Sequence, residues 1–257
     1  MLTGIFALWF FLTFASLVFI IYDLLLVTPA PWVMKIAWVL VVLYTGPLGL
    51  FIYLLSCREY IAGTHDKMVS ALWKQAIGSE VHCLAGDATG IILAAIIISF
   101  FTVSGKWEMI IEYLAGFIVG LFIFQALFMK KMMGGNYLKA LKKTFIPEWL
   151  SMNMIMAGMI PIMMISRYLD PNAADPASLS FWGSMSLASI IGGIFAYPIN
   201  QWLVRHGLKH GMITGHQETS HDMSTHSSKV SRSKLIFMIL LTLIALWLGS
   251  VIGLSYR

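Results

Sequence analysis

Charged residues are scarce in this 257-residue chain, at 11% against about 25% in an average soluble protein. Hydrophobic residues make up 59% of it. This number of charged residues is too small to cover the water-exposed surface of a soluble protein of this size. The composition therefore predicts an integral membrane protein. The net charge of +5 is explained below by topology, and no nucleic-acid partner is predicted.

Other absences narrow the class further. The sequence has no HExxH motif, no phosphate-binding loop and no nucleophile–base pair. The last apolar run has no lysine for a Schiff base, which excludes a retinal protein. Only two cysteines occur, Cys57 and Cys83. Both are predicted on or near the cytoplasmic side, where a structural disulfide is not expected.

Seven apolar runs are long enough to cross about 30 Å of hydrocarbon, which takes around 20 helical residues. We therefore predict an all-α, polytopic membrane helix bundle of about seven transmembrane helices, forming one domain over residues 1–257. Gly46-Pro47 predicts a kink in the second run. The runs cover residues 5–26, 32–55, 78–103, 108–129, 147–167, 178–203 and 235–254.

Basic residues are concentrated in the loops after the second, fourth and sixth runs, which hold thirteen of the 17 Lys and Arg residues. By the positive-inside rule, these loops are cytoplasmic. With seven spans, the N-terminus is then expected in the cytoplasm and the C-terminus outside.

The third run opens with ionisable side chains: Glu80, His82, Cys83 and Asp87. At roughly 100° per residue, Glu80, Cys83 and Asp87 share one helical stripe, and His82 flanks it. Ionisable groups inside a membrane helix are costly, so they indicate a functional site facing the bundle interior. A polar network that only ties helices together is the alternative.

The fifth run contains a methionine stripe at helical spacing: Met152, Met156, Met159 and Met163. Thioethers and thiolates are the ligands that copper(I) prefers. Plastic packing is the alternative, because methionine fills irregular gaps well.

Further polar residues are predicted at the same inner depth of the membrane. Glu148 and Asn153 begin the fifth run from the cytoplasm, and Tyr197 and Asn200 end the sixth towards it. If the third, fifth and sixth runs are neighbours, they enclose a polar, sulfur-containing cavity open to the cytoplasm.

A histidine-rich cytoplasmic loop is predicted over residues 206–233. Such a tract is typical of metal collection, although a solvated loop explains it equally well. Its histidines are His206, His210, His216, His221 and His226.

Together these patterns favour a transition-metal transporter whose ligand or substrate is copper(I), ahead of nickel, cobalt or zinc. A cytoplasmic collecting loop slightly favours efflux over uptake. Glu80 and Asp87 could instead couple protons. Two other classes stay open: a membrane-embedded metal-dependent enzyme acting on a lipid or small substrate, and a haem-binding or copper-oxidase assembly subunit. We predict membrane lipid and a metal ion as partners and no organic cofactor, and we leave homo-oligomerisation open.

Three segments carry a resemblance to a known family: His82 to Asp87, Pro147 to Asn153, and Tyr197 to Leu203 with the following His-Gly-Leu-Lys-His-Gly-Met. Over about residues 70 to 215 the chain resembles a bacterial multi-span membrane family defined only as a domain of unknown function. The resemblance implies the bacterial inner membrane and a loose association with copper handling. His82 and Asp87 also resemble the His-x4-Asp part of the nickel/cobalt permease signature, whose next residue is histidine; here it is Ala88.

Overall fold

The computed structural model describes residues 2–101, 103, 105–127, 130, 135–211 and 230–256, and this part of the chain is all helical. Seven helices are long and apolar enough to cross a membrane, counting α5 with η1 as one, which confirms the predicted class. The elements are α1 (Leu2–Leu26), α2 (Trp32–Ser56), α3 (His65–Val69), α4 (Leu72–Ile98), α5 (Gly105–Ile118), the π-helix η1 (Val119–Gln125), α7 (Tyr137–Leu169), the 3₁₀ helix η2 (Pro171–Ala174), α8 (Leu179–Arg205) and α9 (Arg232–Ser255).

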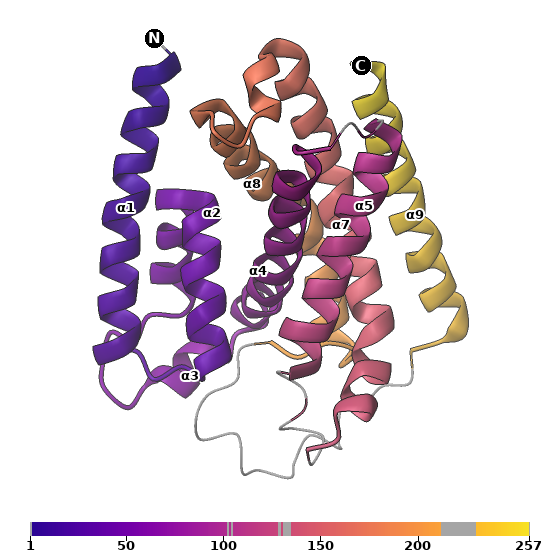
Figure 1. Ribbon diagram of the computed structural model, residues 1–257. Helices are drawn as coiled ribbons and strands as arrows, with labels where there is room; N and C mark the ends of the chain where they lie inside the picture. The colour runs from indigo at the N-terminus through magenta and orange to yellow at the C-terminus, as the bar shows by residue number, and fades with distance from the viewer. Residues whose placement is uncertain are drawn as a thin grey trace.

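Helix α2 folds back on itself. Gly46 has φ 59° and ψ −140°, outside the helical region, and Pro47 follows it. At 1.5 Å per residue the two arms are only about 21 and 15 Å long, shorter than the hydrocarbon core. The tip at Gly46 lies against Trp9 and Thr13 of α1, whereas Arg58, just past the second arm, pairs with Asp23 near the other end of α1. Helix α2 is therefore a re-entrant hairpin with both ends on one side (Figure 1).

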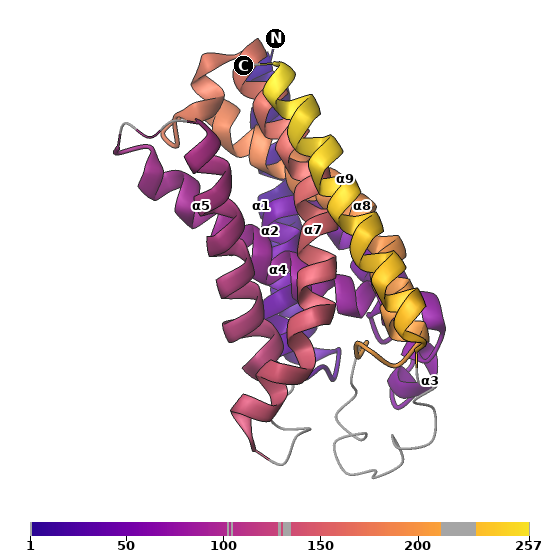
Figure 2. The same cartoon turned by 90° about the vertical axis from the view of Figure 1, so that its right-hand side faces the viewer.

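The hairpin changes the topology. Figures 1 and 2 place the start of α1 and the end of α9 at the same end of the bundle. The expectation that the two termini lie on opposite sides is therefore wrong, because α2 enters and leaves the bundle at one end instead of crossing it.

Positive charge gathers at the end opposite the termini, where Figure 1 shows the last residues of α1 and α8 and the first residues of α7 and α9. Twelve of the fourteen described Lys and Arg residues lie at or near this basic end: Lys35, Arg58, Lys67, Lys74, Lys130, Lys139, Lys142, Lys143, Arg205, Lys209, Arg232 and Lys234. The positive-inside rule then predicts that the basic end is cytoplasmic and that both termini are outside.

Helix α4 is the centre of the bundle and packs against α2, α5, η1, α7 and α8. Glycines bring it close to its neighbour, because Gly86 and Gly90 face Gly120 and Gly116 across the contact with α5 and η1. A Cβ on Gly86 would lie 2.6 Å from the Gly120 Cα. Paired Gly-xxx-Gly spacings of this kind permit close backbone approach in membranes. This contact fixes the depth of the ionisable residues that α4 carries.

A buried polar cluster ties the base of the α2 hairpin to α1. Asp23 forms an ion pair with Arg58, whose Nε lies 2.9 Å from Oδ1. Thr28 and Tyr53 donate hydrogen bonds to the Asp23 Oδ2, at 2.8 and 2.5 Å. One carboxylate is thus paired with one guanidinium, and both Asp23 oxygens have a hydrogen-bond or ion-pair partner. We call these four residues the hairpin-base cluster.

Candidate functional site

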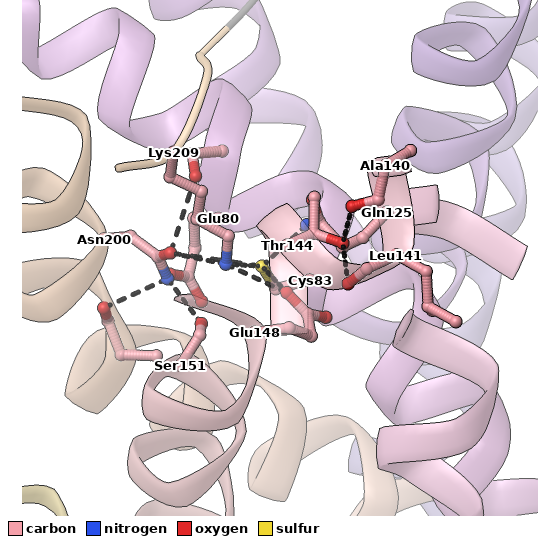
Figure 3. A network of polar contacts seen from close by, with 12 residues as sticks. Glu80, Cys83, Gln125, Ala140, Leu141, Thr144, Glu148, Ser151, Asn200 and Lys209 are labelled. Atoms are coloured by element: carbon pink, nitrogen blue, oxygen red, sulfur yellow. Dashed lines mark hydrogen bonds and ion pairs between the residues drawn. The ribbon is translucent and has the colours of Figure 1, made fainter. Parts of the chain in front are cut away.

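A second polar cluster lies between the helices of the bundle (Figure 3). Helices α4, α7 and α8 pack against one another, as the predicted cavity required. They bring together Glu80, Cys83 and Asp87 from α4, Glu148 from α7 and Asn200 from α8. None of these side chains is more than 7% exposed. The structure therefore brings these five predicted residues together between the three helices.

Lys209 enters this cluster from the segment that follows α8. Gly207 turns the chain with φ +67°, and the Leu208 and Lys209 amides both donate to the Leu203 carbonyl, at 2.9 and 3.3 Å. The Lys209 side chain is thereby directed back into the bundle, and the residue is only 5% exposed. Its Nζ lies 3.0 Å from the Glu148 Oε2.

The Lys209 ammonium also donates to the Asn200 Oδ1 at 3.0 Å and to the Cys83 Sγ. Burial by itself lowers the pKa of Lys209, but the Cys83 and Glu148 groups beside it raise the pKa more, so that the net shift is upward. These two neighbours thus favour the charged form of Lys209.

Cys83 lies between an acceptor and a donor. Its thiol donates to the Glu148 Oε2 at 3.2 Å, and the Gln125 Nε2 donates to its sulfur, also at 3.2 Å. Gln125 is the last residue of the π-helix η1. A π-helical turn shifts the register of the side chains that follow it and is frequent at functional sites. Here Gln125 is the side chain that reaches Cys83 from this turn.

Asn200 connects the three main helices. Its Nδ2 donates to the Ser151 Oγ of α7 at 2.8 Å and to the Glu80 Oε2 of α4. Its Oδ1 accepts from Lys209. An amide fits here because it donates to one side and accepts from the other. Asn200 thus sets the spacing between Glu80 and Lys209.

Asp87 and Glu148 face one another across Gly120. A Cβ on Gly120 would lie 2.0 Å from the Asp87 Oδ1 and 2.8 Å from the Glu148 Oε1, so both oxygens occupy the space that the missing side chain leaves. Neither Asp87 oxygen has a hydrogen-bond donor among the described residues, and neither does the Glu148 Oε1. Two buried acids this close must share a proton or hold a cation. We call Asp87 and Glu148 the carboxyl pair.

The charges of the site do not balance. Glu80, Asp87 and Glu148 are three buried acids. In the described part of the chain, the one ion pair that any of them forms with a Lys or Arg is that of Glu148 with Lys209. A buried carboxylate that lacks a counter-charge is strongly disfavoured. The site can therefore take up further positive charge, either as protons or as a cation.

The other predicted metal ligands, His82 and the four methionines, do not all face the same neighbouring helix. His82 is 1% exposed beside this cluster, and all four methionines of the stripe are buried. However, Met152 packs beside Gly116 of α5 whereas Met159 packs beside Gly192 of α8, so the stripe serves two different interfaces. In the described part of the chain, no three His, Cys, Asp or Glu side chains are grouped so as to hold a metal ion.

The remaining predicted residues lie around the site or away from it. The Asn153 amide contacts Tyr113 of α5 and Thr242 of α9, and Tyr197 is half-buried. His206 hydrogen-bonds the Trp202 carbonyl at 2.8 Å at the end of α8. Burial lowers the pKa of His210 to about 4, and the nearby positive charge of Lys143 adds to this shift. His216, His221 and His226 lie outside the described residues.

Sequence reasoning missed three members of the cluster, Lys209, Gln125 and Ser151. Lys209 counts in the sequence as one more basic loop residue. The signal that could have found it is the pair Gly207 and Gly211 on either side, since close backbone packing often requires glycine. A Cβ on Gly211 would meet Gln75 at 2.2 Å, so this segment is packed tightly against α4.

The fold and the site define a polytopic membrane protein with ionisable groups buried between its helices. The chain belongs to the family described as "Domain of unknown function (DUF4396)", whose model matches residues 72–209. This match runs from the first residue of α4 to Lys209 and so contains the whole site. Comparison with curated proteins and with solved structures found no match.

Proposed function

We propose that this protein is a membrane carrier for a cation, in which protons and the carried cation compete for the carboxyl pair. The observation that supports this most directly is the excess of buried acid. Three carboxyl groups surround one ammonium, and three oxygens of the carboxyl pair have no donor among the described residues. Intramembrane acids of this kind are typical of ion and proton pathways.

Lys209 has a defined part in this proposal. Its ammonium occupies the position beside Glu148 and Cys83 that an incoming cation would take. When the segment of residues 207–211 moves outward, the carboxyl pair loses its fixed positive charge and gains affinity for another cation. When the segment returns, Lys209 displaces that cation. A bound ion must be able to leave, and such a tethered competitor supplies the means.

A transition metal, with copper(I) first, remains the cargo that we propose. Its support is chemical: the Cys83 thiol lies 3.2 Å from Glu148, and Met152 is one helical turn further along α7. Copper(I) favours this pair of sulfur ligands, whereas a hard cation favours the carboxylates alone. Nickel, cobalt and zinc are the other metals to compare.

The test measures protons released when a cation binds. Purified full-length protein in weakly buffered detergent at pH 7 would receive copper(I) under anaerobic conditions, then nickel, cobalt, zinc or sodium ions, while a pH-sensitive dye records the response. At least one cation should release about one proton per chain, because the carboxyl pair shares one. The Glu148→Gln variant should lose the response, and Asp170→Asn, at a partly exposed position just past the end of α7, should keep it.

A second comparison identifies the cargo. The triple variant Met152→Leu/Met156→Leu/Met159→Leu keeps the side-chain volumes nearly constant, so it should fold normally. If copper(I) is carried, this variant should lose the copper-dependent release and keep any response to a hard cation. An unchanged copper response would remove copper from the proposal. No proton release with any of the cations would overturn the carrier proposal itself.

A further inference from the structure

A polar and glycine stripe runs along α5 and η1 from the outer end of the bundle to the site. Glu108, Glu112, Gly116 and Gly120 are spaced four residues apart, so they lie on one side of this helix. At the inner end, Gly120 adjoins the carboxyl pair, and Gly116 adjoins Met152. At the outer end, Glu108 and Glu112 adjoin Arg167. The stripe therefore lies where α5 and η1 meet both α7 and α4, since Gly116 and Gly120 also adjoin Gly90 and Gly86 of α4.

Helix α7 presents a matching stripe. Glu148, Arg167 and the methionines of the stripe fall within an arc of about 100° when each residue turns by roughly 100°. Within this arc, Glu148 adjoins Gly120, Met152 adjoins Gly116 and Arg167 pairs with Glu108 and Glu112, whereas Met159 packs against α8. We call the contact that the first three make with α5 and η1 the α5–α7 seam. It leads from the carboxyl pair, past the Met152 thioether, to the outer ion pair. The Tyr113 hydroxyl and the Asn153 amide meet at 2.7 Å between these two ends.

The outer end of the seam repeats the arrangement at the inner end. Arg167 Nη1 lies 3.1 Å from the Glu108 Oε2, and its Nη2 lies 3.4 Å from the Glu112 Oε1. The Glu112 side chain is 2% exposed. Two acids again meet one fixed cation, on the side opposite Lys209. The two fixed charges thus stand at the two ends of one seam.

We infer that the α5–α7 seam is the route between the carboxyl pair and the outer side, and that Arg167 closes its outer end. This inference rests on the proposed carrier function. Arg167 is a gating residue: its guanidinium holds Glu108 and Glu112 on α5 against the end of α7. A passing cation would replace it on these two carboxylates, as it would replace Lys209 at the other end.

Cys83 provides a native reporter for this route. In a Cys57→Ser background it is the sole thiol of the chain, and it lies at the inner end of the seam. Sealed vesicles of known orientation would be treated with a cationic, membrane-impermeant thiosulfonate, and modification of Cys83 would be followed by intact-protein mass. Arg167→Ala should raise the rate of Cys83 modification by reagent added on the side of the termini about tenfold. This factor corresponds to a loss of about 1.4 kcal/mol of the free energy that holds the outer end closed.

Matched variants separate a gate from a general loosening. Arg205→Ala, at an exposed arginine near the basic end, should leave the rate unchanged, and Arg167→Lys should restore most of the protection. Glu112→Gln weakens the same contact from the other partner and should also raise the rate from the outer side alone. This second variant decides the matter if Arg167→Ala does not fold.

Three results would overturn the inference: an unchanged outer rate in Arg167→Ala and Glu112→Gln, an equal rise from both sides, or a rise from the basic end alone. Proton release by the detergent-purified protein does not depend on the outer gate. If the parent protein releases protons but Arg167→Ala does not change the rate of Cys83 modification from the side of the termini, the seam is not the route. The carrier proposal then still stands. If the release is absent from the parent protein, the carrier proposal itself fails.

Discussion

Two buried clusters in this protein use the same chemistry and differ in balance. In the hairpin-base cluster, Asp23 has one cationic partner, Arg58, and both of its oxygens are occupied. In the inner site, three acids are buried with one cation, Lys209, which pairs with Glu148, and both oxygens of Asp87 have no donor among the described residues. A balanced cluster stabilises one arrangement of helices. An unbalanced cluster keeps a demand for positive charge that protons or ions can satisfy.

The difference also follows the family boundary. The family match contains the inner site and begins after the α2 hairpin and α3. The hairpin-base cluster therefore lies outside the part of the chain by which the family is defined. This division supports a structural role for Asp23 and a functional role for the carboxyl pair, and substitutions can separate the two roles.

The largest effect on stability is expected from Lys209→Met. It removes the cation of the inner site and leaves its acids without a partner, which should cost about 3 kcal/mol of unfolding free energy at pH 7. The cost should shrink as the pH falls towards 5, because protonation of the acids then replaces the lost charge. Denaturant unfolding in detergent measures both effects. Lys67→Met, at an exposed lysine, is the control, and a Lys209→Met protein as stable as the parent at pH 7 would contradict the charge balance described here.

A smaller loss of stability is expected from Asp23→Asn. The amide oxygen can still accept from Thr28 and Tyr53, but Arg58 loses its carboxylate, which should cost about 1–2 kcal/mol. Arg58 is 31% exposed and can regain water, which limits the loss. Cation-dependent proton release should be unchanged. A loss of release in this variant would show that the two clusters are coupled and would undo the comparison.

The smallest effect on stability, and a complete loss of proton release, are expected from Asp87→Asn. The substitution removes a buried acid that lacks a donor among the described residues, so stability should be unchanged or rise by about 1 kcal/mol. The same unfolding and proton-release measurements apply to this variant. If Asp87→Asn were as destabilising as Asp23→Asn and still released protons, Asp87 would be a structural residue like Asp23.

The helices and much of the site could be predicted because membrane helices carry strong local signals. Apolar length gave the number of helices, and the i, i+3, i+7 spacing placed Glu80, Cys83 and Asp87 on one face. The cost of burying such groups indicated that this face points inward. The positive-inside rule likewise identified which loops lie together, since the basic residues do gather at one end.

The sequence by itself thus determined the class of protein, the helical segments and the acids of the site, because each follows from local composition and period. Tertiary structure alone decided that α2 turns back, since Gly-Pro fits both a kink and a reversal, and packing against Trp9 and Thr13 accompanies the reversal. It also decided that Lys209 and Gln125 join Cys83, because no local pattern tells which way a loop side chain points. For the same reason the balance of charge, on which the proposed function depends, could be read only after the chain had folded.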